Sequence, residues 1–176
     1  MVRPIVDDFA TNGEVRKAAR ADIEGMKKFI LQHGPNQWNN LDGVEAHLDE
    51  ICTGETEAML AFEGGKLVGF ISYNSEKKLA ERYLHNEDIG RECGYLAEAV
   101  VHREYVGRGI GRQLAELIKV DLLARGINTI YVMHHEENIP SRRAWERAGF
   151  SVVKTIYDPE IRPNGSRRTT IQRFVA

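Results

Sequence analysis

Hydrophobic residues follow two patterns along the chain, a helical spacing of three or four positions and short continuous runs. The changes from one pattern to the other mark the predicted helices and strands. Four segments place apolar residues three or four positions apart, the spacing of a helix packed on one side: 22–33, 43–51, 109–125 and 140–148. Short apolar runs of strand length occur at 57–62, 66–73, 95–102, 127–133 and 150–157. Weaker strand patterns are found at 14–19 and 167–175. In the second half strands and helices alternate regularly, which predicts an α/β fold with helices on both faces of a sheet.

Turn-forming residues separate these elements, but no linker divides the chain. Glu63-Gly64-Gly65 predicts a hairpin turn between two strands, and Pro163-Asn164-Gly165 predicts a turn before the last strand. Residues 74–92 are polar and charged, so we expect mainly a loop there. We therefore expect one domain over residues 14–176, preceded by a short N-terminal extension over residues 1–13.

Charge balance and cysteine content narrow the function classes. The 176 residues include 24 Lys and Arg against 26 Asp and Glu, for a net charge of −2. A nucleic-acid-binding domain usually has a basic excess, so we expect no nucleic-acid partner. No apolar run approaches the roughly 20 residues that span a bilayer, so we expect no membrane partner. Cys52 and Cys93 form no paired motif, which is typical of a reducing compartment and predicts a cytoplasmic protein.

Three glycines at alternate positions, Gly107, Gly109 and Gly111, lie between a predicted strand and the longest predicted helix. Glycine lets the backbone turn tightly and leaves no Cβ in the way of a ligand. The first turn of the following helix exposes backbone N–H groups at the positive end of the helix dipole. Arg108 and Arg112 add positive charge at the rim. The segment is therefore predicted to bind phosphate or pyrophosphate oxygens.

The spacing of these glycines does not match three common nucleotide-binding motifs. The phosphate-binding loop GxxxxGK[ST] requires Lys after its last glycine, where this sequence has Arg112. A dinucleotide fingerprint GxGxxG that starts at Gly107 requires a glycine at that same position. The further motifs of a protein kinase do not follow. An anion-binding loop of another kind is therefore indicated.

Two blocks of the sequence resemble the GNAT superfamily of N-acetyltransferases. Residues 101–111, VHREYVGRGIG, resemble its acetyl-CoA motif, whose core is Gln/Arg-x-x-Gly-x-Gly/Ala. Gly109 and Gly111 match the two small positions, and Val106 stands where the family usually has Gln or Arg. Residues 138–150, NIPSRRAWERAGF, are similar to the family pattern of an Asn, a small residue and then Tyr-Glu-Lys-x-Gly-Phe. The resemblance extends over nearly the whole chain.

This resemblance implies a fold, an acyl donor and a set of binding residues. The implied fold is a central mixed, twisted sheet of six to seven strands flanked by about four helices, and the implied donor is acetyl-CoA. Main-chain amides of the glycine loop would hold the pyrophosphate, splayed N–H groups of the fourth strand would polarise the thioester carbonyl, and two residues of the second block would face the coenzyme. In this sequence these three sets are Val106, Gly107, Arg108, Gly109, Ile110, Gly111 and Arg112; Val100, Val101 and His102; and Asn138 and Ser141.

Acetyl transfer to an amine also needs a group that accepts the proton of the amine. Glu98 is the leading candidate, because an acidic residue inside the apolar run 95–101 is costly unless it is solvated or paired. A carboxylate, or a water that it holds, commonly acts as such a base. Glu98 as a substrate-binding anion or an ion-pair partner stays open. Glu92 is the second candidate. His134 and His135 are further candidates, although histidines after a strand are more often solvated loop residues.

The residues leave open which group protonates the departing thiolate. Trp145 occupies the position of the tyrosine that the family uses. An indole N–H is only a hydrogen-bond donor, and the helical spacing of Trp145 from Ser141 and Ala148 favours packing. Tyr105, Tyr131 or solvent are the alternatives.

Two functions therefore stay open at this stage. The first is an N-acetyltransferase that acts on a primary amine of a small molecule, an amino acid or a protein. The second is a catalytically idle domain that binds acyl-CoA as a regulatory signal, an idea that Trp145 favours. Selection of the amine is expected in the loops 34–42, 74–92 and 158–168. His102, His134 and His135 lack the spacing of a ligand set, so no metal is expected. Homodimers are common in the family that the sequence resembles, so a homodimer is possible by analogy.

Overall fold

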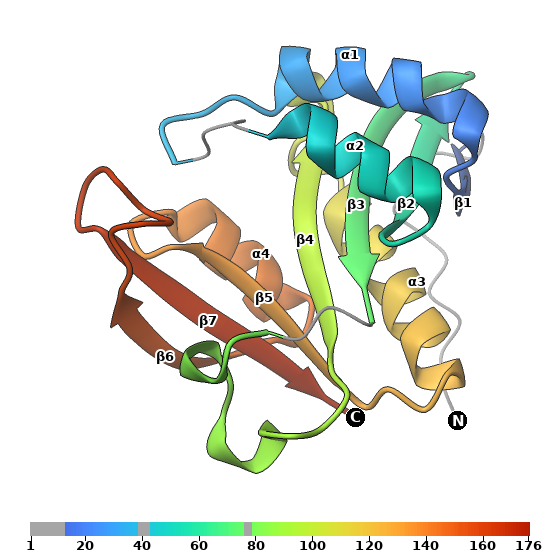
Figure 1. Cartoon of the computed structure of the whole chain (residues 1–176). Coiled ribbons are helices and arrows are strands. Elements are labelled where there is room, and N and C mark those ends of the chain that lie inside the picture. The colour runs from blue at the N-terminus through green and yellow to red at the C-terminus, as the bar shows by residue number, and fades with distance from the viewer. Residues whose placement is uncertain (1–12, 39–42, 76–78) are drawn as a thin grey trace.

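The computed structural model describes residues 13–38, 43–75 and 79–176. The strands are β1 (Gly13–Lys17), β2 (Glu57–Glu63), β3 (Lys66–Asn74), β4 (Gly94–Val101), β5 (Thr129–His135), β6 (Ser151–Tyr157) and β7 (Arg168–Val175). The helices are α1 (Ile23–His33), α2 (Val44–Thr53), α3 (Ile110–Ala124) and α4 (Ile139–Arg147) (Figure 1). Gly13, expected in the N-terminal extension, already belongs to the first strand, and residues 1–12 lie outside the described residues.

The strands form one seven-stranded mixed sheet in the order β1-β2-β3-β4-β5-β7-β6. Pairing is antiparallel from β1 to β4, parallel between β4 and β5, and antiparallel between β5, β7 and β6. The predicted α/β fold with a mixed sheet and four helices is confirmed. Its periodic segments correspond to the observed elements within a few residues at each end, because burial on one or both faces fixes those patterns.

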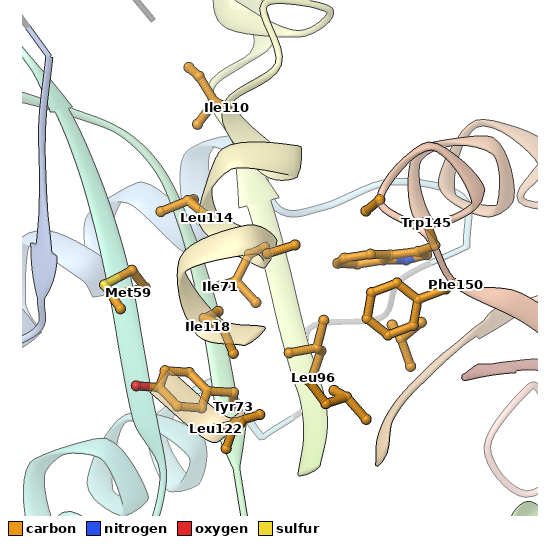
Figure 2. Close-up of a cluster of buried hydrophobic side chains, with 14 of the residues drawn as sticks. Met59, Ile71, Tyr73, Leu96, Ile110, Leu114, Ile118, Leu122, Trp145 and Phe150 are labelled. Carbon is orange, nitrogen blue, oxygen red and sulfur yellow. The ribbon is translucent and has the colours of Figure 1, made fainter. Parts of the chain in front are cut away.

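The helices cover both faces of the sheet. Helices α1 and α2 pack on one face through a cluster of apolar side chains that also includes β2, β3 and β4: Met26, Phe29, Ile30, Leu48, Ala58, Leu60, Phe70 and Val100. Helices α3 and α4 pack on the opposite face, where a larger cluster gathers Met59, Ile71, Tyr73, Leu96, Ile110, Leu114, Ile118, Leu122, Trp145 and Phe150 (Figure 2). The sheet is thus the middle layer of three, as the alternating pattern predicts.

Of the predicted loop over 74–92, Asn74 still belongs to β3, and residues 79–92 cover the α1/α2 side of the sheet beyond those two helices. This segment contains two short 3₁₀ turns, Glu81–Tyr83 and Asn86–Asp88. Tyr83 and Leu84 from this segment pack with Tyr131 of β5 and Ile171 of β7. The segment is therefore part of the core even though its sequence is mostly polar.

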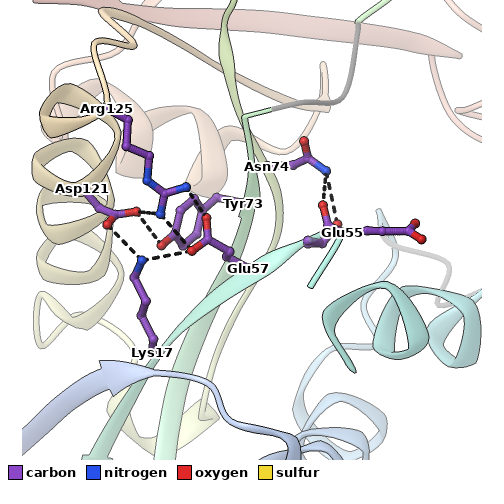
Figure 3. Close-up of polar contacts among 8 residues, drawn as sticks. Lys17, Glu55, Glu57, Tyr73, Asn74, Asp121 and Arg125 are labelled. Atoms are coloured by element: carbon purple, nitrogen blue, oxygen red, sulfur yellow. Dashed lines mark hydrogen bonds and ion pairs between the residues drawn. The ribbon is translucent and has the colours of Figure 1, made fainter. Parts of the chain in front are cut away.

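A group of charged side chains ties the C-terminal end of α3 to the first strands (Figure 3). The guanidinium of Arg125 donates to both carboxylate oxygens of Glu57, at 2.5 and 2.8 Å, and also to Asp121. Lys17 of β1 lies 2.9 Å from a carboxylate oxygen of each acid, and the hydroxyl of Tyr73 donates to Asp121 at 2.9 Å. These contacts hold α3 in a fixed position along the sheet, with its N-terminal end at the predicted anion-binding loop.

Candidate active site

Strands β4 and β5 lie side by side over only part of their length. They pair in parallel through Gly94–Leu96 and Ile130–Val132, but β4 continues to Val101 and β5 to His135. Figure 1 shows the two strands diverging beyond the paired segment. The divergence opens a gap in the middle of the sheet. Beyond Leu96, none of the strands in the described part of the chain pairs with β4 on that side.

A bulge in β4 lies at the start of this gap. Ile71 of β3 pairs with Ala99 and Tyr73 pairs with Leu96, so that Ala97 and Glu98 together oppose the single residue Ser72. The Ser72 hydroxyl accepts a hydrogen bond from the backbone N–H of Glu98 at 3.0 Å. The same Oγ lies 2.8 Å from Nε2 of His47 on α2. A side chain therefore holds the bulge in place of a regular pair of backbone hydrogen bonds.

The pairing decides which N–H groups of β4 face the gap. The N–H of His102 donates to the carbonyl of Val68 on β3 at 2.9 Å, and Val100 pairs with Phe70. Because hydrogen-bonding direction alternates along an antiparallel strand, the N–H groups of Ala99 and Val101 point the opposite way, into the gap.

The sequence-based set Val100, Val101 and His102 is therefore corrected in two places. The N–H of His102 is used within the sheet, and its ring is buried against His33 at 4.0 Å between ring centroids. Val100 points its side chain into the α1/α2 cluster and directs its N–H toward β3. The N–H groups that face the gap are those of Ala99 and Val101. The sequence does not show this shift, because it depends on where the extra residue of the bulge is inserted.

The glycine loop follows β4 and leads into α3. Gly107 and Gly109 have φ angles of +86° and +80°, in the left-handed region that favours glycine, and Gly109 is the N-cap of α3. The first helical hydrogen bond runs from the N–H of Gln113 to the carbonyl of Gly109. The N–H groups of Ile110, Gly111 and Arg112 therefore precede the hydrogen-bonded ladder and point out of the positive helix end. This geometry is that of an anion-binding site.

The side chains of this loop are exposed to solvent, contact a neighbouring ring or are buried in the core. Val106 is 69% exposed, and the Arg108 guanidinium lies over the ring of Tyr105, 4.5 Å from its centroid. Ile110 is only 2% exposed and anchors the first turn in the core. A Cβ added at Gly107 would meet no atom within 4 Å. Main-chain groups at this loop are therefore open to a ligand.

A cavity of about 540 Å³ extends from the gap between β4 and β5. Residues from five parts of the fold line it: Asn36, Gln37, Trp38, Tyr95, Leu96, Ala97, Glu98, Ala99, Val132, Met133, His134, His135, Asn138, Ser141, Trp145, Ile161, Arg162, Pro163 and Asn164. Of the candidate site residues, Glu98, His134, His135, Asn138 and Ser141 lie in this lining, together with Trp145. The second base candidate, Glu92, is exposed, precedes the paired end of β4 and is not among these residues.

Helix α4 positions three of these lining residues. Asn138 is its N-cap, and the side-chain oxygen accepts the N–H of Ser141 at 3.1 Å. The indole N–H of Trp145 donates to the Ser141 hydroxyl at 3.1 Å, and its ring packs edge-on against Phe150 at 5.7 Å. Trp145 is 7% exposed. Its predicted packing role is confirmed.

Three tyrosines differ in their access to the cavity. Tyr131 is fully buried, donates its hydroxyl to Asp88 and accepts the N–H of His85 at 2.9 Å, outside the lining. Tyr105 also lies outside it. Tyr95, which the sequence did not single out, does line the cavity, and burial raises its pKa to about 12. A protonated tyrosine is therefore present at the site at neutral pH.

The two histidines at the end of β5 are buried members of the strand, so the expectation of solvated loop residues is wrong. His134 lies between the carbonyl of His135 at 2.8 Å and the side-chain oxygen of Gln172 at 2.9 Å, and burial lowers its pKa. Nδ1 of His135 accepts the N–H of Glu137, so its Nε2 donates to the carbonyl of Asn164 at 2.9 Å. Polar residues are usually buried only where they have hydrogen-bond partners, and the sequence pattern does not show the partners of these two histidines.

Two negative findings concern the described residues only. Within the ranges that the structure describes, no group of three or more His, Cys, Asp or Glu side chains is arranged to hold a metal ion. Over the same ranges, no helix has the length and apolar character needed to cross a membrane.

Comparisons with known proteins agree on one family. A sequence model of the acetyltransferase (GNAT) family matches residues 25–150. A comparison with curated proteins finds no match. At these low identities the similar solved structures show a shared fold. They include a protein from Desulfovibrio desulfuricans assigned to the GNAT family, with 17% identity and a TM-score of 0.72. The match covers 93% of the present chain and 98% of the Desulfovibrio protein.

Two more of these similar structures are acetyltransferases by name. YncA from Salmonella typhimurium, solved with acetyl-CoA as its cofactor, has 18% identity, a TM-score of 0.68 and 94% coverage of each chain. The ribosomal-protein-S18-alanine N-acetyltransferase from Escherichia coli has 14% identity, a TM-score of 0.68 and 93% coverage of each chain.

Proposed function

The chain belongs to the acetyltransferase (GNAT) family, and on that premise we propose that it transfers the acetyl group of acetyl-CoA to a primary amine. The observation that carries the proposal is the bulged edge of β4. It turns the N–H groups of Ala99 and Val101 into the gap and places Glu98 in the wall of the adjoining cavity.

The residues present fit acetyl-CoA as co-substrate. The N–H groups of Ile110 and Gly111 in the first turn of α3 and the open backbone at Gly107 suit the two phosphates of a pyrophosphate. Val106 supplies no charge there, so main-chain donors carry the contact. Asn138 and Ser141 form the opposite wall, at the start of α4.

In the proposed reaction the amine nitrogen bonds to the acetyl carbon and the carbon–sulfur bond breaks. The N–H groups of Ala99 and Val101 donate to the carbonyl oxygen as it gains negative charge, which lowers the barrier because they are already oriented. Glu98 takes the proton that leaves the nitrogen, directly or through a water. One proton must also reach the departing thiolate. Tyr95 or solvent supplies it, because the Trp145 N–H cannot.

The test is thiol release from acetyl-CoA across a panel of amines, with Glu98→Gln beside the unaltered protein. For a general base we expect kcat to fall by about 10²- to 10⁴-fold. The affinity for acetyl-CoA should stay within about twofold, because the side chain of Glu98 is separate from the main-chain donors of the loop. Glu92→Gln is the matched control and should keep its rate, since this carboxylate is exposed outside the cavity.

Two outcomes would reject parts of the proposal. Unchanged turnover in Glu98→Gln would remove this residue as the base. Acetyl-CoA binding without thiol release for any amine, including free amino acids and peptides, would instead support the idle regulatory domain. Binding itself is measured by the rise in thermal unfolding temperature that a bound ligand must cause.

We also propose a cytoplasmic location and a single domain over residues 14–176. The described thiols are unpaired, and that of Cys52 is exposed, which suits a reducing compartment. A homodimer is proposed only by analogy with the family, and sedimentation of the purified chain measures it.

A further inference from the structure

Arg162 is a cationic residue in the cavity wall that the proposed reaction does not use. It lies in the loop between β6 and β7 and lines the same cavity as Glu98. Its backbone N–H donates to the carbonyl of Asp158 at 2.8 Å, and its Nε donates to the hydroxyl of Thr169 at 3.3 Å. Burial lowers the pKa of the guanidinium. The side chain is thus held in place and partly removed from water.

Its two terminal nitrogens have no carboxylate partner among the residues that the structure describes. The nearest buried acid, Asp158, is already used by the Tyr83 hydroxyl at 2.9 Å, the Thr169 hydroxyl at 3.0 Å and the Arg82 guanidinium at 3.2 Å. Glu98 also acts on Arg162 through its charge. A desolvated guanidinium with unused donors is costly, and an anion that enters the cavity offsets that cost.

We propose that the acceptor is a small primary amine that carries its own carboxylate, such as an α-amino acid. This inference rests on the proposed acetyl transfer and names its substrate class. The planar guanidinium of Arg162 matches a carboxylate with two parallel hydrogen bonds, and Glu98 faces the same space for the amine. The amine at the end of a protein has an amide where an amino acid has its carboxylate. Arg162 therefore selects free amino acids over protein termini.

The test compares each of the twenty standard α-amino acids with its amide as acceptor, in the unaltered protein and in Arg162→Gln. For the best amino acid we expect kcat/KM to exceed that of the amide by about 10- to 100-fold, as for the loss of a hydrogen-bonded charge. Arg162→Gln should raise KM for the amino acid by a similar factor and leave the amide unchanged. Arg162→Lys keeps the charge but not the planar pair of donors and should lie between.

Arg168→Gln is the matched control, because Arg168 is exposed at the start of β7 and does not line the cavity. Its kinetics should equal those of the unaltered protein. Acetyl-CoA binding, measured by thermal shift, should be retained in every variant and shows that each is folded.

The outcomes separate this inference from the broader proposal. Equal rates for amino acids and their amides, or transfer to peptides and carboxylate-free amines but to no amino acid, overturn the role of Arg162 and leave the acetyltransferase intact. Failure to bind acetyl-CoA, or failure to acetylate any amine, overturns both.

Discussion

Replacing Ser72 with alanine tests whether one hydroxyl group holds the bulge on which the proposed chemistry depends. Ser72 is completely buried. Its removal leaves the Glu98 N–H without its partner at 3.0 Å and takes away the contact at 2.8 Å with His47. An unsatisfied buried donor costs about 1–3 kcal/mol, and a lost neutral hydrogen bond about 0.5–1.5 kcal/mol. We expect a total loss of about 3 kcal/mol in the free energy of unfolding.

Urea unfolding followed by circular dichroism measures this loss directly. For a chain of this size, about 3 kcal/mol corresponds to a fall of about 6–12 °C in the thermal midpoint. The matched control is Ser151→Ala, the same deletion at an exposed position of β6, which should change the stability by less than about 0.5 kcal/mol. If Ser72→Ala were as stable as this control, the hydroxyl would not be what holds the bulge.

A kinetic measurement on the same variant asks whether the bulge also serves the reaction. Because Ser72 fixes the residue next to Ala99, its loss should misplace the donor that faces the thioester. Misplacement of about 1 Å can cost a factor of about 10² in rate, so we expect kcat to fall at least about tenfold while acetyl-CoA affinity changes little. An unchanged kcat in a destabilised but folded variant would show that the bulge matters for stability alone.

Three further changes test the loop, the helix packing and the pH dependence. Gly107→Ala and its control Gly64→Ala, both at positive φ with open space around the Cβ position, should each cost about 1 kcal/mol of stability, but only the former should weaken acetyl-CoA binding in a titration. Lys119→Met removes the buried ammonium that donates to the carbonyl of Ala148 at the end of α4 and should lower the free energy of unfolding, measured in urea, by about 1–3 kcal/mol; an unchanged free energy would show that this carbonyl finds another donor. Hydrogen bonds from an arginine lower the pKa of Asp22. Its stabilising effect is therefore fully present above the unfolded pKa of about 4 and is lost as the pH falls through the lower pKa of the folded state, so the stability deficit of Asp22→Asn at pH 7 should shrink as the pH falls through that range.

Much of the fold follows from the sequence because hydrophobic period and burial are directly linked. The helix from Ile110 to Ala124 shows four buried residues at helical spacing, and the glycine loop before it has the backbone angles that its composition predicts. The positions of these elements need no knowledge of distant contacts. The same holds for the candidate base Glu98, which is visible as one acid in an apolar run.

The rest of the site depends on contacts between distant segments, which a local pattern does not contain. Ser72 reads as an ordinary strand residue, and only the register of β3 against β4 shows that it opposes two residues. Arg162 lies in a polar loop, where an arginine is usually solvated. The burial of His135 comes from a carbonyl 29 positions away, that of Asn164. Each of these roles exists only after the chain has folded.

The bulge links the two cores and the reaction site through one extra residue. Side chains alternate between the faces of a strand, so Leu96 and Val100 would share a face if β4 were regular. In the structure Leu96 packs with α3, whereas Val100 packs with α1 and α2. The inserted residue therefore reverses the alternation between them, and both cores depend on that reversal. The same insertion turns the N–H of Ala99 toward the gap and Glu98 toward the cavity. Core packing thus enforces the geometry of the site, which explains how an irregular segment can persist in the middle of the sheet.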